Sequence, residues 1–311
     1  MAISRASIAK ELLPGLNAVF GLEYGEVNNE HEALFEIESS DRAFEEEVMF
    51  TGFATAPVKG EGAAVSYDTA QETYVSRYTN ETVALAFAVT EEAMEDNLYD
   101  TFSKLRARGL ARAMANTKQV KGADVFNNGF SAAPAYVGGD GVAFFSASHP
   151  TVSGGIQSNV AAASDLSEAA LETIITNIQK IKDDRNILIG SSAVSLHIPP
   201  DLWSTADQIL HSPGSTVAGG TGDGTYAQNN INAIRHMGMI PEGFFVNRRF
   251  TDTNNYYIKT DVPNGAKMFV RVPLQTKMEP DFDTGNLRFK ARERYSFGFS
   301  DWRSYFGSQG S

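Results

Sequence analysis

The order of apolar and polar residues changes its period several times along this chain, and each period predicts a different element. Between residues 47 and 89, strand-forming residues alternate with polar ones, and KGEGAA at 59–64 interrupts them with a polar, glycine-containing stretch. Thr, Val, Tyr and Phe on both sides of such a break are typical of two strands joined by a turn. We therefore predict a long two-stranded hairpin with its tip at 59–64 and at least one face covered by water or by a partner.

A helical period follows the hairpin. Over residues 91–127 apolar residues recur at intervals of three and four, which places them on one face of a helix. The residues of that face are Met94, Leu98, Phe102, Leu105 and Gly109. Thr90 can cap the helix, and acidic residues in its first turn suit the positive end of the helix dipole. At ~1.5 Å per residue the helix would span roughly 50 Å, so we predict that it forms a spine.

A second amphipathic helix begins near residue 165, because Asp165 and Glu168 have the spacing of a capping box. Its predicted buried stripe consists of Leu171, Ile174, Ile175, Ile178 and Ile181. A strand at 187–200, a short helix at 201–212 and a long loop at 213–230 come next, and the remainder is mostly strand. The mixture predicts an α+β fold.

The last strand alternates most strictly. Leu287, Phe289 and Ala291 fall on one side, and Arg288, Lys290 and Arg292 fall on the other. Period-two alternation is the pattern of a strand with one buried face. We predict a strand that is apolar on one face and basic on the other.

Residues 1–45 have too few apolar residues for a core of their own, so we predict an arm rather than a domain. Pro14 and Gly15 should interrupt its first helical segment.

Composition narrows the function classes. The 311 residues carry a formal net charge of −12, which opposes non-specific binding to phosphates. Cysteine is absent, so there are no disulfides and no thiolate metal site. No apolar run approaches the ~18 residues of a membrane span, and the start lacks the apolar core of a secretion signal.

Candidate chemistry is weak. In FFSASHP, at 144–150, Ser146 and Ser148 lie beside His149. A serine nucleophile needs a base within hydrogen-bond reach, yet neighbouring residues of an extended segment point to opposite faces. We interpret this stretch as an ordered loop with the two phenylalanines in the core. The glycine-rich GGTGDGTY lacks a phosphate-binding pattern, and the five histidines have no metal-ligand spacing. We predict no catalytic residue, no cofactor and no metal, and hence no enzyme.

The distribution of charge is more informative. Basic residues gather in the second half of the spine helix and along the last strand, whereas the arm and the approach to the hairpin are acidic. The plain interpretation is a solvated surface with a favourable helix dipole. The sharper one is self-complementarity between copies of the chain. The candidate inter-subunit residues are Glu45, Glu46, Glu47, Lys59, Glu61, Arg106, Arg108, Arg112, Arg288 and Arg292.

Three stretches resemble one known family. They are TNETVALAFAVTEEAMEDNLYDTFSKL, which enters the spine helix; FFSASHPTVSGGIQSN with the LSEAALETIITNIQKIKDDRN helix; and the ending NLRFKARERYSFGFSDWRSYFGS. Together they resemble the major capsid proteins of tailed bacteriophages, in the group of the Mu-like prophage major head subunit. The similarity covers about residues 45–308.

The resemblance implies the Hong Kong 97 capsid fold. Its parts would be an N-terminal arm at 1–45, an extended loop at 46–88, a peripheral domain with the spine helix at 89–135 and 260–311, and an axial domain at 136–259. The 213–230 loop would lie near the capsomer axis.

The implied function is structural. Copies would form the pentamers and hexamers of an icosahedral shell, assembled in the cytoplasm of a bacterial host, that encloses double-stranded DNA without sequence-specific binding. Portal, scaffold and cement proteins are implied partners, with no membrane. Because the chain starts without a scaffold segment, we expect a separate scaffold protein. Some relatives cross-link a hairpin lysine; Lys59 lies at the tip, but no partner is identifiable, and we expect no cross-link.

Two alternatives remain open. An encapsulin-like nanocompartment would use the same fold to hold enzymes instead of DNA. A serine hydrolase using Ser148 and His149 is the alternative from another class.

Overall fold

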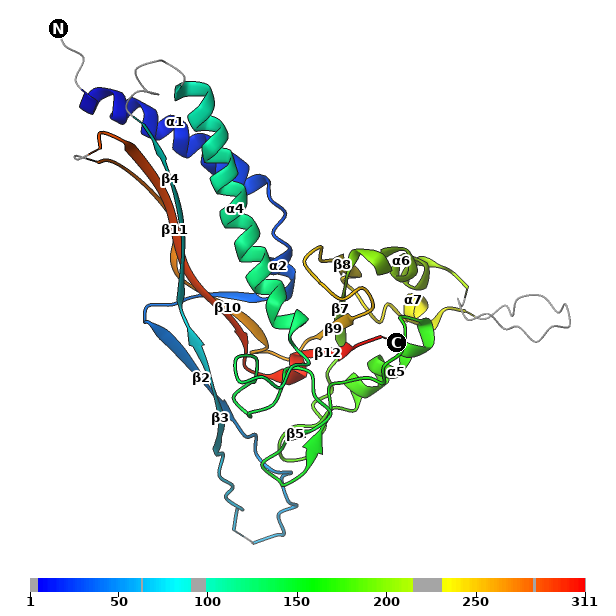
Figure 1. Ribbon diagram of the computed structural model, residues 1–311. Helices are drawn as coiled ribbons and strands as arrows, with labels where there is room; N and C mark the ends of the chain where they lie inside the picture. The colour runs from blue at the N-terminus through cyan, green and yellow to red at the C-terminus, as the bar shows by residue number, and fades with distance from the viewer. Residues whose placement is uncertain (1–4, 63, 91–98, 215–230, 282–283, 311) are drawn as a thin grey trace, which may run out of the picture.

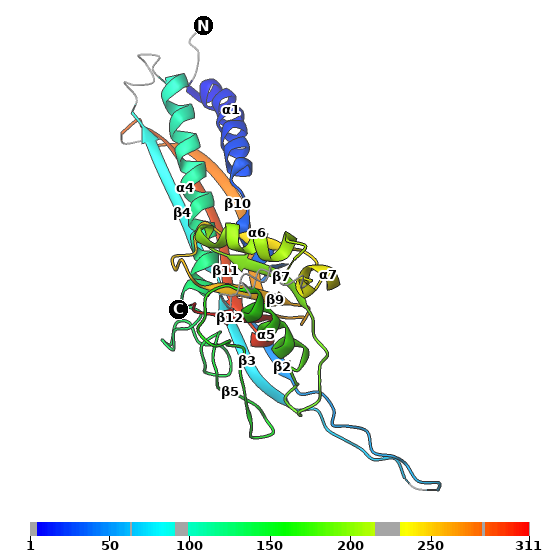
Figure 2. The same cartoon turned by 90° about the vertical axis from the view of Figure 1, so that its right-hand side faces the viewer.

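The structure is a computed structural model that describes residues 5–62, 64–90, 99–214, 231–281 and 284–310. Figure 1 shows an elongated part, built of two helices along a narrow sheet, and a more compact part that contains the C-terminus. A thin hairpin leaves the junction of the two parts. Figure 2 shows that the hairpin continues the long axis of the sheet away from the helices.

The elongated sheet has the strand order β1-β10-β11-β4. β10 (Ala266–Pro280) pairs antiparallel with β11 (Leu287–Phe299), which pairs antiparallel with β4 (Glu81–Val89). The short β1 (Glu36–Ser39) lies parallel to the start of β10. The alternation predicted for β11 is confirmed, because Leu287, Phe289 and Ala291 are buried and the three basic residues between and after them are exposed.

Two helices cover the apolar face of this sheet. They are α1 (Arg5–Glu26) and α4 (Tyr99–Asn127), and Figure 1 shows them side by side. α2 (Glu30–Leu34) follows α1 and contacts α4. The small core between the helices and the sheet consists of Leu16, Phe20, Val89, Ala107, Leu110, Ala111, Met114, Leu287, Phe289 and Ala291.

Three sequence predictions about these helices can be compared with the structure. The long helix is confirmed from Tyr99 to Asn127, whereas its predicted start at 91–98 lies outside the described residues. Its predicted buried face is wrong at the two described positions, since Leu105 and Gly109 are exposed. The break at Pro14 and Gly15 is also wrong, because α1 continues through both. Packing of the second half of α1 on the sheet, through Leu16 and Phe20, stabilises the helix that the proline disfavours.

A buried ion pair fastens the helices to the sheet. The ammonium of Lys118, on α4, lies 2.6 Å from the carboxylate of Glu293, which is buried on β11. The hydroxyl of Tyr24, on α1, donates to the same carboxylate. Burial, then the charge of Glu293, raises the pKa of Tyr24 above its usual range. The pair therefore joins three elements of the elongated part.

The hairpin consists of β2 (Phe44–Phe50) and β3 (Glu72–Thr79), which confirms the predicted pair of strands. Residues 51–71 between them form no helix or strand among the positions described. The predicted extent of the hairpin, 47–89, is wrong beyond Thr79, because after Asn80 the returning chain continues as β4, which pairs with β11 rather than with β2.

The compact part contains a second sheet of order β12-β9-β7-β8. Its strands are β7 (Ala193–Ile198), β8 (Phe244–Val246), β9 (Tyr256–Thr260) and β12 (Tyr305–Ser308). Around it lie α5 (Glu168–Gln179), α6 (Trp203–His211), α7 (Ala233–Met237), the single turns η1 (Pro200–Leu202) and η2 (Trp302–Ser304), and a small hairpin of β5 (His149–Pro150) and β6 (Ile156–Gln157). The main core lies in this part.

Phe126, at the end of α4, joins the two parts. Its ring is fully buried and makes edge-to-face contacts with Phe35, Phe144, Tyr257 and Tyr305. The prediction that both phenylalanines of FFSASHP lie in the core is confirmed, since Phe144 and Phe145 are buried.

α7 corrects another expectation, since the segment after 230 was predicted to be mostly strand. The side chain of Asn232 accepts a hydrogen bond from the backbone N–H of Arg235, and Gly238 ends the helix in the left-handed conformation. A capping side chain and a left-handed glycine are strong local helix signals even over one turn.

The second amphipathic helix is confirmed, and all five residues of its predicted stripe are buried. Its predicted cap is wrong: the N-cap is Ser167, whose hydroxyl accepts from the backbone N–H of Ala170 at 3.3 Å.

We expect Ser167→Ala to lower the free energy of unfolding by about 1 kcal/mol, because one N–H of the first turn loses its acceptor. Urea denaturation measures the change, with Ser192→Ala, at another exposed serine, as the matched control. Equal stability of the two variants would contradict the assignment of the cap.

Candidate inter-subunit surfaces

The hairpin exposes an apolar face, on which the described chain covers only the ring of Phe44 in part, with the guanidinium of Arg77 at 3.8 Å. Phe44, Val48 and Phe50 on β2 are 37%, 36% and 62% exposed, and Val75 on β3 is 48% exposed. Val48 and Val75 are direct cross-strand partners. Apolar side chains grouped on one exposed face mark an interaction site more often than scattered ones do. This face, Phe44, Val48, Phe50 and Val75, is called the hairpin face below.

The root of the hairpin is fixed to the body by a buried cation. The ammonium of Lys267, on β10, lies 2.8 Å from Glu38 and also pairs with Glu47 on β2. Burial alone would lower the pKa of Lys267, but hydrogen bonds and charge from the two carboxylates outweigh it and raise the pKa above its ordinary value. Glu47 also accepts from the hydroxyl of Ser300. The hairpin therefore leaves the body from a rigid root.

A second contact lies farther along the hairpin. The guanidinium of Arg185, in the loop after α5, donates to Asp68 at 3.2 Å and to the carbonyl of Thr69. The other carboxylate oxygen of Asp68 accepts from the backbone N–H of Ala54 at 2.7 Å, across the loop. Asp68 thus ties the two sides of the loop to each other and to the body.

The structure separates the acidic candidates of the sequence analysis. Glu45 accepts from the hydroxyl of Ser40 at 2.8 Å, and Glu46 lies 3.9 Å from Arg77 across the hairpin. Glu47 belongs to the root. Lys59 and Glu61 are exposed near the tip. Of the triplet, Glu46 is the carboxylate on the hairpin's exposed face.

The basic candidates of the sequence analysis also differ in the contacts they make. Arg108 and Arg112 on α4 both pair with Glu23 of α1, so within one chain they hold the two helices together. Arg106 is exposed on the same helix. Arg288 pairs with Asp281. Arg292 is exposed on the open face of the sheet, opposite the helices.

That open face has a regular composition. Arg288, Lys290 and Arg292 of β11 stand directly beside Ala88, Ala86 and Ala84 of β4, and all six are exposed. The alanines leave the cations of β11 accessible on the β4 side, while on the β10 side Glu279 lies beside Arg288. These six residues are called the basic sheet face. The sequence alternation indicated the cations, but the alanines beside them became visible only with the strand register.

The geometry around His149 does not support catalysis there. Its Nδ1 lies 2.6 Å from Asp140 and its Nε2 lies 3.1 Å from the side-chain oxygen of Asn159, while the ring stacks on Trp302 at 4.1 Å. Both ring nitrogens are engaged, and the imidazole is fully buried. Ser148 instead faces Ser146, with 3.4 Å between the hydroxyl oxygens. A base for Ser148 would need a free ring nitrogen within reach.

Two further findings concern the described residues only. They contain no group of three or more acidic or histidine side chains placed to hold a metal ion. Nor does any helix in the described ranges combine the length and apolarity needed to cross a bilayer.

Residues 73–306 match the family described as phage capsid protein. The chain belongs to this family. The match runs from the second strand of the hairpin to the start of β12, and so includes the spine helix and all the strands of both sheets except β1 and the end of β12. The Mu-like subgroup suggested by the sequence stays a prediction. No curated protein matches the chain.

Solved structures give the fold. The capsid of an empty GTA particle matches with a TM-score of 0.55 at 12% identity, covering 92% of this chain and 91% of that one. The procapsid of bacteriophage JBD30 matches with a TM-score of 0.54 at 14% identity, over 99% and 77%. A virus-like particle from Pyrococcus furiosus matches with a TM-score of 0.53 at 9% identity, over 96% and 99%. The predicted α+β fold of the Hong Kong 97 type is confirmed.

Proposed function

We propose that this chain is the major capsid protein of a tailed double-stranded DNA bacteriophage, and that its copies assemble into the pentamers and hexamers of an icosahedral shell. The family match over residues 73–306 carries the proposal. The hairpin face supports it, because an extended two-stranded element with uncovered apolar residues is marginally stable alone and gains from a neighbouring copy.

The proposal includes a division of labour within the chain. We assign residues 1–45 to an arm, 46–88 to the extended loop, 89–135 and 260–311 to the peripheral domain, and 136–259 to the axial domain. The sharing of one sheet by β4, β10 and β11, beneath α4, supports placing β10 and β11 with the spine helix, whereas the last strand, β12, pairs with β9 in the compact part.

Charge suggests how copies meet. In our proposal the acidic side of the hairpin, with Glu46 and Glu61, approaches the basic sheet face of another copy, where Lys290 and Arg292 are exposed. Complementary charge of this kind guides the docking of partners more than it adds affinity. Arg108 and Arg112 join that contact only if their pairs with Glu23 rearrange.

The remaining partners follow from the family. We propose that the shell encloses double-stranded DNA, that portal, scaffold and cement proteins act with it, and that it is assembled in the cytoplasm of the bacterial host. The net charge of −12 supports a wall that holds its genome without sequence-specific contacts. A structural role without catalysis is supported by the engaged ring of His149.

The encapsulin-like alternative is less favoured, because the matching family is one of phage capsids. Cargo enzymes found inside the particles, in place of phage DNA, would favour the encapsulin-like alternative over the phage capsid.

Size-exclusion chromatography with light scattering and negative-stain microscopy test the proposal. We expect closed particles of many copies, or capsomers that close when a scaffold is supplied. A species that keeps the mass of a monomer or dimer under all these conditions contradicts it. Capsomers without closure in the presence of scaffold would contradict the shell.

A further inference from the structure

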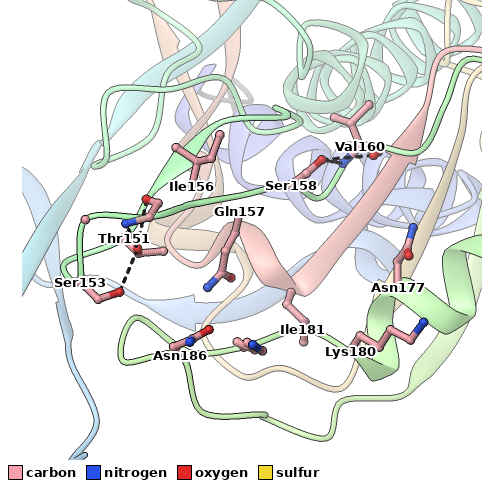
Figure 3. A pocket seen from close by; sticks show the side chains of 13 residues that line it. Thr151, Ser153, Ile156, Gln157, Ser158, Val160, Asn177, Lys180, Ile181 and Asn186 are labelled. Carbon is pink, nitrogen blue, oxygen red and sulfur yellow. Dashed lines mark hydrogen bonds between the residues drawn. The ribbon is translucent and has the colours of Figure 1, made fainter.

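A groove of about 760 Å³ opens at one edge of the compact part. The turn of the β5–β6 hairpin forms one wall, and the end of α5 with the segment after it forms the other. In Figure 3 the side chain of Gln157 points from β6 into the space above the segment that carries Ile181 and Asn186. Its amide is held there, because its Nε2 donates to the carbonyl of Asp183 at 3.0 Å.

The groove is lined by positively charged side chains, although the chain as a whole is acidic. Its lining includes Lys180 and Lys182 and three side-chain amides, but no Asp or Glu. Both lysines are exposed, and within the described residues neither pairs with a carboxylate. The chain as a whole carries −12. Such a groove favours an occupant that brings carboxylates.

The opposite edge of the same sheet carries a protruding tryptophan. Trp203, the first residue of α6, is 58% exposed, although the chain has only two tryptophans and the other, Trp302, is 3% exposed. Asp207 lies one helical turn away and Asp201 lies just before the helix; both are exposed. Asp207 also holds the exposed His211 at 2.8 Å.

The sheet itself shows that groove and tryptophan lie at opposite edges. β12 is one edge strand, and its Gly307 bridges to Val160, which lines the groove. β8 is the other edge strand, and α6 contacts it. Figures 1 and 2 both place α6 and the β5 hairpin on opposite sides of this sheet.

We propose that Trp203 of one copy enters the groove of the next copy, with Asp201 and Asp207 beside Lys180 and Lys182. A contact between different surfaces at opposite edges is head-to-tail, and repeated contacts of that kind close into a ring when the rotation permits. Tryptophan is enriched among residues that dominate interface energies, since it buries a large area and keeps one polar group. The inference rests on the proposed function and specifies its ring contact.

Trp203→Ala is the first test. Because the side chain is exposed in the single chain, we expect an unchanged thermal midpoint but at least a tenfold loss of rings and shells by light scattering. Leu22→Ala, which removes a 72% exposed apolar side chain from α1, is the matched control. Reversing the charges with Lys180→Glu and Lys182→Glu should also block assembly, and adding Asp201→Lys and Asp207→Lys to that chain should restore it.

Cross-linking tests the contact directly, because the chain has no cysteine of its own. Lys180→Cys mixed with Asp207→Cys should give a reducible dimer on oxidation, and the chain that carries both substitutions should give a ladder that ends at the ring size. Glu172→Cys on the exposed side of α5 replaces Lys180→Cys as the control. A disulfide requires the two Cα atoms to approach within about 7 Å, so a cross-link at this pair identifies the neighbours.

The outcomes separate the two proposals. Shells from Trp203→Ala at the wild-type level, or shells in which the chain with both cysteine substitutions gives no reducible ladder, overturn the groove contact and leave the capsid function intact. Failure of the unmodified chain to form any particle removes both. Loss of assembly in Trp203→Ala, rescue by the charge exchange and the ladder together establish the contact.

Discussion

Replacing residues 53–69 by an Asn-Gly turn should leave a folded protein that forms no stable shells. The cut is compatible with the fold because Thr51 and Gln71 already close the strands: Thr51 donates its N–H to the carbonyl of Gln71 at 2.9 Å, and its hydroxyl accepts from the N–H of Gln71. The change removes Phe53, Tyr67 and the Asp68 contact to Arg185, which is a partly exposed pair worth little to stability.

Assembly should suffer because the removed segment is the part of the chain that reaches farthest from the body (Figure 2). Circular dichroism and the thermal midpoint check folding, and light scattering with microscopy checks the particles. Thr55→Ala with Ser66→Ala, which keeps the loop and its charges and changes only two exposed polar side chains, is the control. Normal shells from the shortened chain would show that residues 53–69 are not an inter-subunit element.

Where a pattern is local, the sequence alone predicted correctly which face of an element is buried. The alternation of Leu287, Phe289 and Ala291 with basic residues defines the two faces of β11 without any knowledge of its partners, because side chains of a strand alternate by geometry. The stripe of α5 was predicted for the same reason. Both elements meet a partner on one side only, so their own polarity shows which side is buried.

The spine helix shows where this reasoning fails. Its buried face combines Leu110 and Met114 with Ala107, Ala111 and Ala115, and the three alanines allow close approach but carry a weak apolar signal. Leu105 carries a strong signal and is 64% exposed. The face is selected by α1, about a hundred residues earlier, and by the sheet, nearly two hundred residues later. The spacing of apolar residues within the helix does not show which of its faces such distant partners cover.

Charges mislead in a similar way. The sequence showed free acidic and basic groups, but Glu47 belongs to the buried site of Lys267, and Arg108 and Arg112 belong to Glu23. These pairs join residues that lie far apart in the chain, so composition could not separate structural pairs from surface charge. The strand register adds this information: it places Lys290 and Arg292 on the exposed face of the sheet and Glu46 on the exposed side of the hairpin, outside those pairs.

Acid should destabilise the single chain through a buried histidine of the compact part. His197, on β7, is fully buried, and its Nε2 lies 3.0 Å from the hydroxyl of Ser195. Phe245 and Tyr305 pack against the ring. Burial, and then the charge of Lys259, lowers the pKa of His197 from its ordinary value of 6.5 to about 3. The folded state therefore keeps this imidazole neutral.

The direction of the effect follows from proton binding. Above pH 6.5 the imidazole is neutral in both the folded and the unfolded chain, so the folded state loses no stability through it. Below pH 6.5 the unfolded chain binds a proton that the folded chain does not bind, so the free energy of unfolding falls until the pH nears 3. At pH 5.0 the loss from His197 is about 2 kcal/mol. Burial also lowers the pKa of His31, which adds a loss of the same sign.

Urea denaturation at pH 7.5 and 5.0 measures the loss, and comparison with the double variant His197→Phe, Ser195→Ala isolates it. That variant removes both the titrating ring and the hydroxyl that would otherwise lose its partner, so its stability should fall by about 2 kcal/mol less than that of the unmodified chain. His236→Gln, at an exposed position, should retain the full loss. Because every other titrating group is shared, identical pH dependence in all three chains would show that His197 is charged in the folded state.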